Sequence, residues 1–420
     1  MQPTTPSPGF TQTRPVSILG RTFSALRYYN YRLWFTGQLV SLFGTWMQTT
    51  AQGYLIYELT GSAAYLGYVG FAAGLPSWLF TLYGGAIADR MPRRRLLLIT
   101  QTVMMVLAFI LAGLTFTGLV KPWQIILLAF LLGIANAFDA PARLAFVPEL
   151  VDRQDLTNAI ALNSTMFNTA TVIGPALAGL TYAAFGPQWC FVINGLSFLA
   201  VITALAFMRL QPFIPSPRRG STASEVRHGL RYAANHPVIR LLILNLGVIS
   251  LFGVGFITLI PAWAVEVLGG DARTAGFLQA ARGLGALAGA LMIASLGSLS
   301  LRGRMLTLGG WVMPILLIAF STTRQTPLSL LTLFGVGWGF MIMMNTSNSL
   351  AQTNVEDSLR GRVMGVYTLT FFGLMPVGSL INGALAARIG PPTTVMLNAL
   401  IMLAFAAFLW LRFPHFRKLE

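Results

Sequence analysis

The chain has 420 residues, of which 55% are hydrophobic and 10% are charged, and its mean hydropathy is +0.68. A soluble domain carries about a quarter charged residues, so this composition excludes an ordinary water-soluble fold and indicates a helical protein that crosses a membrane many times. The net charge of +16 could indicate a protein that binds nucleic acid. The distribution of the positive residues, described below, argues against that partner.

The first residues, 1–22, are polar and contain no apolar core of the kind that a cleavable signal peptide needs. We expect a disordered cytoplasmic tail there, followed by an amphipathic lead-in over 23–32. Twelve apolar segments follow, each long enough to cross a bilayer. They lie near 33–57, 65–88, 96–118, 122–140, 157–184, 187–208, 238–264, 273–296, 304–321, 326–349, 363–387 and 392–412. An even number of spans places both chain ends on one side.

Lysine and arginine set the orientation, because the cytoplasmic loops of membrane proteins carry an excess of them. Most of the 28 lie on the side of the two chain ends. The opposite side holds Lys121, Arg273, Arg324 and Arg388, while Arg282 lies inside a span. We therefore expect a multi-pass protein of the plasma (inner) membrane with both termini in the cytoplasm. This arrangement accounts for the basic charge without nucleic acid.

The chain divides after the sixth span. The stretch 209–237 begins with a polar, proline-rich segment and ends in a predicted short surface helix. We predict a first half over 23–208, a cytoplasmic linker over 209–237, a second half over 238–413 and a cytoplasmic tail over 414–420.

The two halves resemble each other, as expected for an internal duplication. Glu58 lies near the end of the first span and Glu266 near the end of the seventh, so each half leaves an acid at the outer mouth. Pro175 within the fifth span corresponds to Pro376 within the eleventh. The matches are weak one by one, but together they indicate two related halves.

The turn between the second and third spans places one acid among four arginines, in Gly84-Gly85-Ala86-Ile87-Ala88-Asp89-Arg90-Met91-Pro92-Arg93-Arg94-Arg95. Gly85 and Asp89 are four residues apart and share a helix face. The stretch resembles the signature that major facilitator transporters carry between their second and third helices. The match consists of Gly85, Asp89, Arg90, Arg93 and Arg94. Pro92 stands where the family usually has glycine, which predicts a stiffer turn. An ordinary positive-inside loop would also explain these residue types.

A second stretch, Gly174-Pro175-Ala176-Leu177-Ala178-Gly179, is similar to the exporter-associated motif of that superfamily. Its small residues permit close helix approach, and Pro175 permits a bend in the helix. Generic helix packing explains the pattern equally well. The fourth span lacks the family's arginine motif, which argues against the best-studied proton-coupled drug exporters. Asp139-Ala140-Pro141-Ala142-Arg143 is more similar to the enterobactin-exporter-like branch.

The resemblance covers the chain from about Phe23 to Arg412. It implies an all-α integral membrane protein of twelve transmembrane helices, arranged as two pseudo-symmetric six-helix bundles around a central cavity. It also implies an inner gate, in which Asp89 meets the N-terminus of the eleventh span and Arg93 reaches Asp139. Asp139 could instead only cap a helix or face water.

Arg282 lies well inside the eighth span, where an unpaired charge is costly. We expect it to face a wet cavity and to bind an anionic or polar group of the substrate, or to pair with Glu58 or Glu266. The alternative is a long side chain that snorkels toward the outer surface.

Neutral polar residues complete the predicted cavity. A stripe at helical spacing runs along the first span and consists of Thr45, Gln48, Thr49 and Gln52. Further candidates are the asparagines Asn245 and Asn345, with Asn163, Asn168, Asn348 and Asn382. For any single asparagine, an interhelical hydrogen bond is the favoured alternative.

Enzyme chemistry has little support in this sequence. No phosphate-binding loop is present, and the glycines of Gly283-Leu284-Gly285 lie inside an apolar helix with no preceding strand. Cys190 is the single cysteine, which excludes an internal disulfide. The three histidines are scattered over His228, His236 and His415. We expect no catalytic activity, no cofactor and no metal.

We therefore predict a secondary active transporter that exports a small amphipathic compound, such as a siderophore, a drug or a lipid-like molecule, by alternating access. Its partners would be that small molecule, the lipid bilayer and protons, and we expect a monomer. Proton coupling would act through Asp89, Asp139, Glu58 or Glu266. Two alternatives stay open: a facilitator or importer on the same fold, and a membrane receptor or scaffold that transports nothing.

Overall fold

The computed structural model describes residues 23–210, 222–296 and 302–413. All of the regular elements in these residues are helices. The first half consists of η1 (Ser24–Arg27), α2 (Tyr29–Thr60), α3 (Ala63–Ala88), α4 (Arg93–Phe116), α5 (Pro122–Phe146), η2 (Val147–Glu149), η3 (Arg153–Asp155), α6 (Leu156–Phe185) and α7 (Pro187–Phe207). The predicted tails at 1–22 and 414–420 and the proline-rich part of the linker lie outside the described residues.

The second half begins with a short helix, α8 (Thr222–Asn235), and then crosses six times. Its first crossing is segmented into α9 (Pro237–Val248), η4 (Ile249–Val254), η5 (Gly255–Leu259), α10 (Ile260–Ala262) and η6 (Trp263–Val267), of which η4 and η6 are π-helical. The others are α11 (Ala272–Leu296), α12 (Arg302–Thr322), α13 (Thr326–Thr353), α14 (Asp357–Ile389) and α15 (Pro391–Arg412).

Proline and glycine set the ends of several helices. Pro122, Pro187 and Pro391 are the first residues of their helices, where the missing N–H leaves no hydrogen bond unmade. Gly61 ends α2 with a left-handed φ of 58°, a conformation that suits a residue without a Cβ atom. These local signals explain why the observed crossings lie close to the predicted spans.

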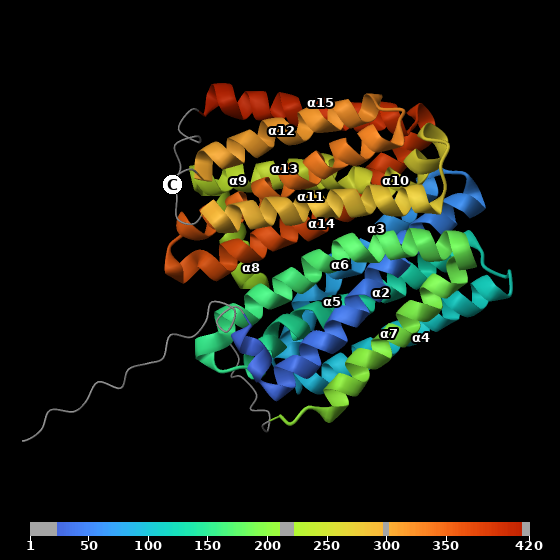
Figure 1. Cartoon of the computed structure of the whole chain (residues 1–420). Helices are drawn as coiled ribbons and strands as arrows, with labels where there is room; N and C mark the ends of the chain where they lie inside the picture. Colours follow the sequence, from blue (N-terminus) through green and yellow to red (C-terminus); the bar gives the residue numbers. More distant parts are fainter. Residues whose placement is uncertain (1–22, 211–221, 297–301, 414–420) are drawn as a thin grey trace, which may run out of the picture.

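The predicted twelve crossings are confirmed in the described residues. Nine of the helical stretches there are long and apolar enough to cross a membrane by length and composition. The helices α2, α3 and α6, with 32, 26 and 30 residues, are also long enough to cross it. Figure 1 shows the helices running side by side in two groups, α2–α7 in one and α9–α15 in the other. The fold is therefore all-α, with two related groups of six crossings.

Both ends of the described chain lie on one face of the molecule, which we call the termini face (Figure 1). Asn30, near the start of α2, donates to the carbonyl of Arg209, just beyond α7, at 2.7 Å. Arg94, at the start of α4, donates to the carbonyl of Ala206 in α7 at 2.8 Å. The other ends of these helices, including Gly61, lie on what we call the opposite face.

Two helix pairs join the halves, α3 with α14 and α6 with α11, and glycine lies at both contacts. A Cβ on Gly67 of α3 would lie 2.9 Å from the carbonyl oxygen of Ser379 and 3.0 Å from the Cα of Gly383, both in α14. A Cβ on Gly276 of α11 would lie 3.0 Å from the Cα of Gly179 in α6. Real Cβ atoms do not approach backbone so closely, so these helices pack backbone to backbone.

The contact between α3 and α14 covers only part of their length. From the opposite face inward, Gly67 meets Gly383, Gly70 meets Ser379, Gly74 meets Pro376 and Trp78 meets Gly373. The same antiparallel register would next bring Gly85 opposite Gly365. A Cβ on either of these two glycines would have nothing within 4 Å. The two helices therefore diverge toward the termini face, so at this helix pair the halves are in contact near the opposite face and apart near the termini face.

These glycines give a direct test of the packing. We expect Gly276→Ala to lower the free energy of unfolding by roughly 1–3 kcal/mol, because its Cβ would overlap backbone atoms of α6. Gly365→Ala is the matched control, and we expect it to be neutral or to stabilise by roughly 0.5–1 kcal/mol, because alanine favours helix and space is open there. Thermal unfolding of purified protein in detergent measures both. Equal effects of the two variants would contradict the described packing.

Candidate transport site and gates

Arg282 lies on the face of α11 that turns away from the exposed apolar residues of that helix. Gly283 beside it contacts Thr171 of α6, and Gly285 contacts Phe334 of α13. The exposed apolar side chains of α11 are Phe277, Leu284 and Leu291, at 42%, 48% and 62%. Because an α-helix turns by about 100° per residue, each of these three side chains points roughly 140° or more away from the direction of Arg282 around the helix axis. Arg282 therefore points into the protein, which argues against the snorkelling alternative.

The guanidinium of Arg282 has no partner among the described residues. Its Nε is buried without a hydrogen bond, and it forms no ion pair there. Neither predicted carboxylate pairs with it, because Glu58 accepts from Tyr182 and Glu266 accepts from Tyr57. An unpaired cation inside a membrane protein is costly, so Arg282 is available to a negatively charged ligand.

The predicted polar stripe of α2 divides between two environments. Thr49 is exposed and Thr45 is half-buried, while Gln48 and Gln52 are buried, with 4% and 6% of their surface exposed. The Oε1 of Gln48 accepts a hydrogen bond of 2.7 Å from Asn194 of α7. Gln48 and Thr49 are adjacent in sequence and so about 100° apart on the helix, which places them toward different neighbours. The threonines remain candidates for cavity lining, whereas Gln48 joins α2 to α7.

The two predicted cavity asparagines lie in different places. Asn345 of α13 is half-buried and has no hydrogen bond among the described residues. Asn245 of α9 is buried and lines a pocket in the second half, which is formed by α9, η4, α12, α13 and α15 and is also lined by Trp311 and Trp410. The structure thus does not bring Asn245 and Arg282 into one described pocket.

The predicted inner gate is not formed in this structure. Asp89 and Arg90 are exposed, and neither makes a side-chain hydrogen bond or ion pair in the described part of the chain. The expected meeting of Asp89 with the start of α14 is therefore absent. The cause is the divergence of α3 and α14, which leaves open space at Gly85 and at Gly365.

The predicted pairing of Arg93 with Asp139 is wrong in this structure. Arg93 pairs with Glu149, which follows α5 in η2. Asp139 is almost fully buried, and its Oδ1 accepts from Thr100 at 2.8 Å and from Gln101 at 2.9 Å. Its Oδ2 lies 3.3 Å from the guanidinium of Arg143, one helical turn further along α5. The i,i+4 spacing of Asp139 and Arg143 was the sequence signal for this pair.

Glycines of α6 serve two contacts. Gly174 packs on the backbone of α2, with its Cβ position 3.1 Å from the carbonyl oxygen of Phe43. Gly179, five residues on, packs on the start of α11. The helix continues without interruption through Pro175, and the carbonyl of Pro175 faces Gly276. The exporter-like motif therefore joins α6 to a helix of its own half and to a helix of the other half.

On the opposite face, tyrosines bind both predicted acids. Tyr57 of α2 donates to Glu266 of η6 at 2.5 Å, and Tyr182 of α6 donates to Glu58 of α2. Tyr54 packs edge-to-face on Tyr182 with ring centroids 5.0 Å apart. Sequence reasoning missed these tyrosines, although Tyr57 directly precedes Glu58 in the sequence.

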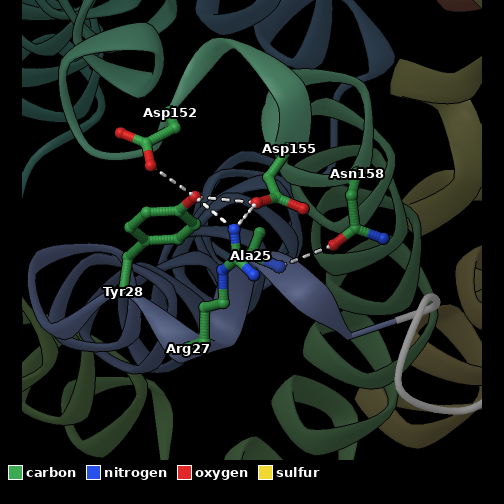
Figure 2. Close-up of polar contacts among 6 residues, drawn as sticks. All are labelled: Ala25, Arg27, Tyr28, Asp152, Asp155 and Asn158. Carbon is green, nitrogen blue, oxygen red and sulfur yellow. Dashed lines mark hydrogen bonds and ion pairs between the residues drawn. The ribbon is translucent and has the colours of Figure 1, made fainter. Parts of the chain in front are cut away.

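A polar cluster on the termini face ties the start of the described chain to the turn before α6 (Figure 2). Arg27 forms an ion pair of 2.6 Å with Asp155, and the hydroxyl of Tyr28 lies 2.7 Å from the same carboxylate. The backbone N–H of Ala25 donates to Asn158 at 2.9 Å. Hydrogen bonds from Ser24 and Tyr28, together with the charge of Arg27, lower the pKa of Asp155.

In the described residues, no cluster of histidine, cysteine, aspartate or glutamate could hold a metal ion. Cys190 is a buried free thiol whose Sγ lies 3.7 Å from the carbonyl oxygen of Ala178. The arrangement as a whole has twelve crossings, one closed face, one open face and an interior arginine without a partner among the described residues. These features define a membrane transporter whose transport path lies between two related halves.

The comparisons with known proteins agree with this class. A family model described as "Transmembrane secretion effector", one of the major facilitator families, matches residues 20–420, so the chain belongs to that family. The Staphyloferrin A transporter of Staphylococcus aureus is 26% identical over 86% of this chain and 90% of its own length. The multidrug efflux pump Tap of Mycolicibacterium fortuitum is 27% identical over 90% and 94%. The enterobactin exporter EntS of Escherichia coli K12 is 26% identical over 92% and 93%.

Solved structures show the same fold at low identity. The nucleoside transporter NupG aligns with a TM-score of 0.67 at 15% identity, over 92% of this chain and 98% of that one. A bacterial homologue of the human lysosomal transporter Spinster aligns with a TM-score of 0.68 at 15% identity, over 96% and 99%. The expected major facilitator fold and the expected secondary transporter of its exporter branch are confirmed.

The cluster at Asp155 gives a prediction for acid conditions. Because the pKa of Asp155 is lowered in the fold, its contribution to stability is present above the ordinary carboxylate pKa of about 4 and is lost as the pH falls through the lowered value. We expect Asp155→Asn to lower the unfolding midpoint at about pH 7, and this deficit to shrink toward about pH 3. Asp357→Asn, at an exposed local ion pair, is the control and should change little. A deficit independent of pH would contradict the ionic role of Asp155.

Proposed function

We propose that this protein exports a small amphipathic molecule that carries negative charge, by alternating access between the bundles 23–208 and 238–413. The observation that carries the proposal is the glycine register of α3 and α14, closed at Gly67 and Gly383 and open at Gly85 and Gly365. A transporter needs two arrangements of this kind, each open on one side only. This structure is one of the two.

The orientation is part of the proposal. The termini face carries most of the arginines, among them Arg90, Arg93, Arg94 and Arg95, so we assign it to the cytoplasm of a plasma (inner) membrane. The structure then corresponds to the state that is open to the cytoplasm, from which an exporter loads its substrate.

Arg282 supports the charge of the substrate. It points into the protein, it has no partner among the described residues, and the two carboxylates expected to pair with it are held by tyrosines. A carboxylate or phenolate of the substrate would accept hydrogen bonds from the guanidinium of Arg282. The apolar part of the substrate would pack against helices that carry few charges. Relatives named for the export of enterobactin and for multidrug efflux fit a small substrate.

The inner gate would form in the other state. When α3 and α14 come together at the termini face, Asp89 would meet the N-terminus of α14, where unpaired N–H groups favour an anion. We infer that the proton gradient drives the cycle and that Asp139, buried beside Arg143, takes part in this coupling. The protein would act as a monomer, because both halves of the cavity come from one chain.

Arg282→Gln tests the substrate class. We expect efflux of anionic amphipathic compounds from proteoliposomes to fall about tenfold or more, because a hydrogen-bonded charge contributes roughly 1.5–3 kcal/mol. Arg282→Lys should retain part of the activity, and Arg388→Gln, at an exposed arginine at the end of α14, should retain all of it. The assay uses an imposed pH gradient and a panel that includes ferric-ion chelators, anionic dyes and cationic dyes. Unchanged efflux of every anionic compound would refute the role of Arg282.

Asp89→Asn tests the gate. We expect transport to fall roughly tenfold while insertion and fold stay intact, since the exposed Asp89 has no side-chain partner among the described residues to lose in the present state. Asp152→Asn, another exposed acid of the first half, is the control. The measurement compares efflux with the amount of folded protein in the membrane. Normal transport by the Asp89 variant would exclude the gate.

A further inference from the structure

One side-chain hydrogen bond crosses between the halves in the part of the chain that the structure describes. Tyr57 of α2 donates to Glu266 of η6 at 2.5 Å, on the closed opposite face. The similar bond from Tyr182 to Glu58 joins α6 to α2 and stays within the first half. The other contacts between the halves described above are close approaches at glycines. Tyr57 and Glu266 therefore lie where the two halves must separate when the opposite face opens.

The two partners differ in their exposure to water. Tyr57 is buried, with 6% of its surface exposed, so its hydroxyl depends on Glu266 for a hydrogen bond in the closed arrangement. Glu266 is exposed, so protons from the solution on the opposite face reach it directly. A proton that binds there also returns to the same solution. Glu266 can thus sense the pH of the opposite side but does not by itself carry protons across.

Tyr57 is the described side chain that forms a hydrogen bond with Glu266. Glu266 and Tyr54 are the ionisable groups that act on Tyr57, and Glu58 and Asp271 are those that act on Tyr54. No described basic side chain forms an ion pair with Glu266, and the first turn of α15 beside η6 has no ionisable residue. Ionised Glu266 is therefore held by Tyr57 alone among the described side chains.

We propose that Tyr57 and Glu266 form a pH-sensitive latch that keeps the opposite face closed. Ionised Glu266 accepts a charge-assisted hydrogen bond, which is about twice as strong as a neutral one. When a proton binds to the carboxylate, the latch weakens, and the equilibrium shifts toward the arrangement that is open on that face. The expected shift in the ratio of open to closed molecules is about tenfold. The latch adds a regulatory site to the proposed exporter and rests on its alternating access.

Distances between spin labels on the opposite face test the latch. The labels are attached at Ser62→Cys, in the turn after α2, and at Gln325→Cys, in the turn before α13, with Cys190→Ser removing the native thiol. Purified full-length protein is measured by double electron–electron resonance at about pH 7 and about pH 4, because carboxylates are protonated to a much larger extent in the second sample. We expect the long-distance population of the otherwise native protein to rise about tenfold relative to the short one at the lower pH. No change with pH would overturn the proposal.

Variants then assign the effect to the two residues. Tyr57→Phe should show the open population at both pH values, because the donor is gone. Glu266→Gln, which keeps the shape and cannot ionise, should lose the pH dependence. Tyr182→Phe removes the similar bond inside the first half and should behave like the parent protein. A pH response retained in Glu266→Gln, or a Tyr182→Phe response equal to that of Tyr57→Phe, would overturn the latch.

A separate measurement distinguishes the latch from the proposed function. Labels on the termini face at Gln154→Cys and Asn354→Cys report whether that face closes when the opposite face opens. If efflux assays find no transport but the distances still respond through Glu266, the latch holds and the export proposal fails. If efflux is normal and the distances ignore Glu266, the latch fails alone.

Discussion

Close backbone contact between the two halves is the constraint on which the rest of this structure depends. Within a membrane, lipid tails are as apolar as the side chains, so helices associate through tight packing and not through burial from water. Glycine provides that packing where α3 meets α14 and where α6 meets α11. Because these contacts involve few polar groups, the halves can separate without leaving many hydrogen bonds unmade. The same glycines that join the halves therefore permit them to part.

Glycines form contacts between the two halves, whereas the charged side chains that pair do so within one half. Asp139 with Arg143 and Arg93 with Glu149 both lie in the first half, as does the cluster at Asp155. Such pairs keep their geometry when a bundle moves as a body, since both partners move together. Arg282 is different, because its guanidinium points into the protein with no partner among the described residues. That contrast is the physical basis for the proposal that Arg282 binds the substrate.

Much of the fold was predictable because its signals are local. Hydropathy located the twelve crossings, and residues such as Pro122, Pro187 and Gly61 set helix ends through backbone chemistry alone. The site was predicted less well. Asp139 was predicted to pair with Arg93 but pairs with Arg143, although the i,i+4 spacing to Arg143 is visible in the sequence. The position of Arg93 could not be predicted in this way, because it pairs with Glu149 in the turn after α5. The stripe on α2 divided for the same reason, since its two neighbours, α6 and α7, are far away in the chain.

The sequence by itself determined the class of protein, the twelve crossings and the uneven distribution of arginine, because composition and hydropathy do not depend on which helices become neighbours. Only the tertiary structure decided which face is closed, that Tyr57 binds Glu266, and that Gly84, and not Gly85, packs closely on α5. These facts depend on the distance between helices that are remote in sequence. A transporter also changes those distances as it works, so one sequence specifies two sets of contacts and a single structure records one of them.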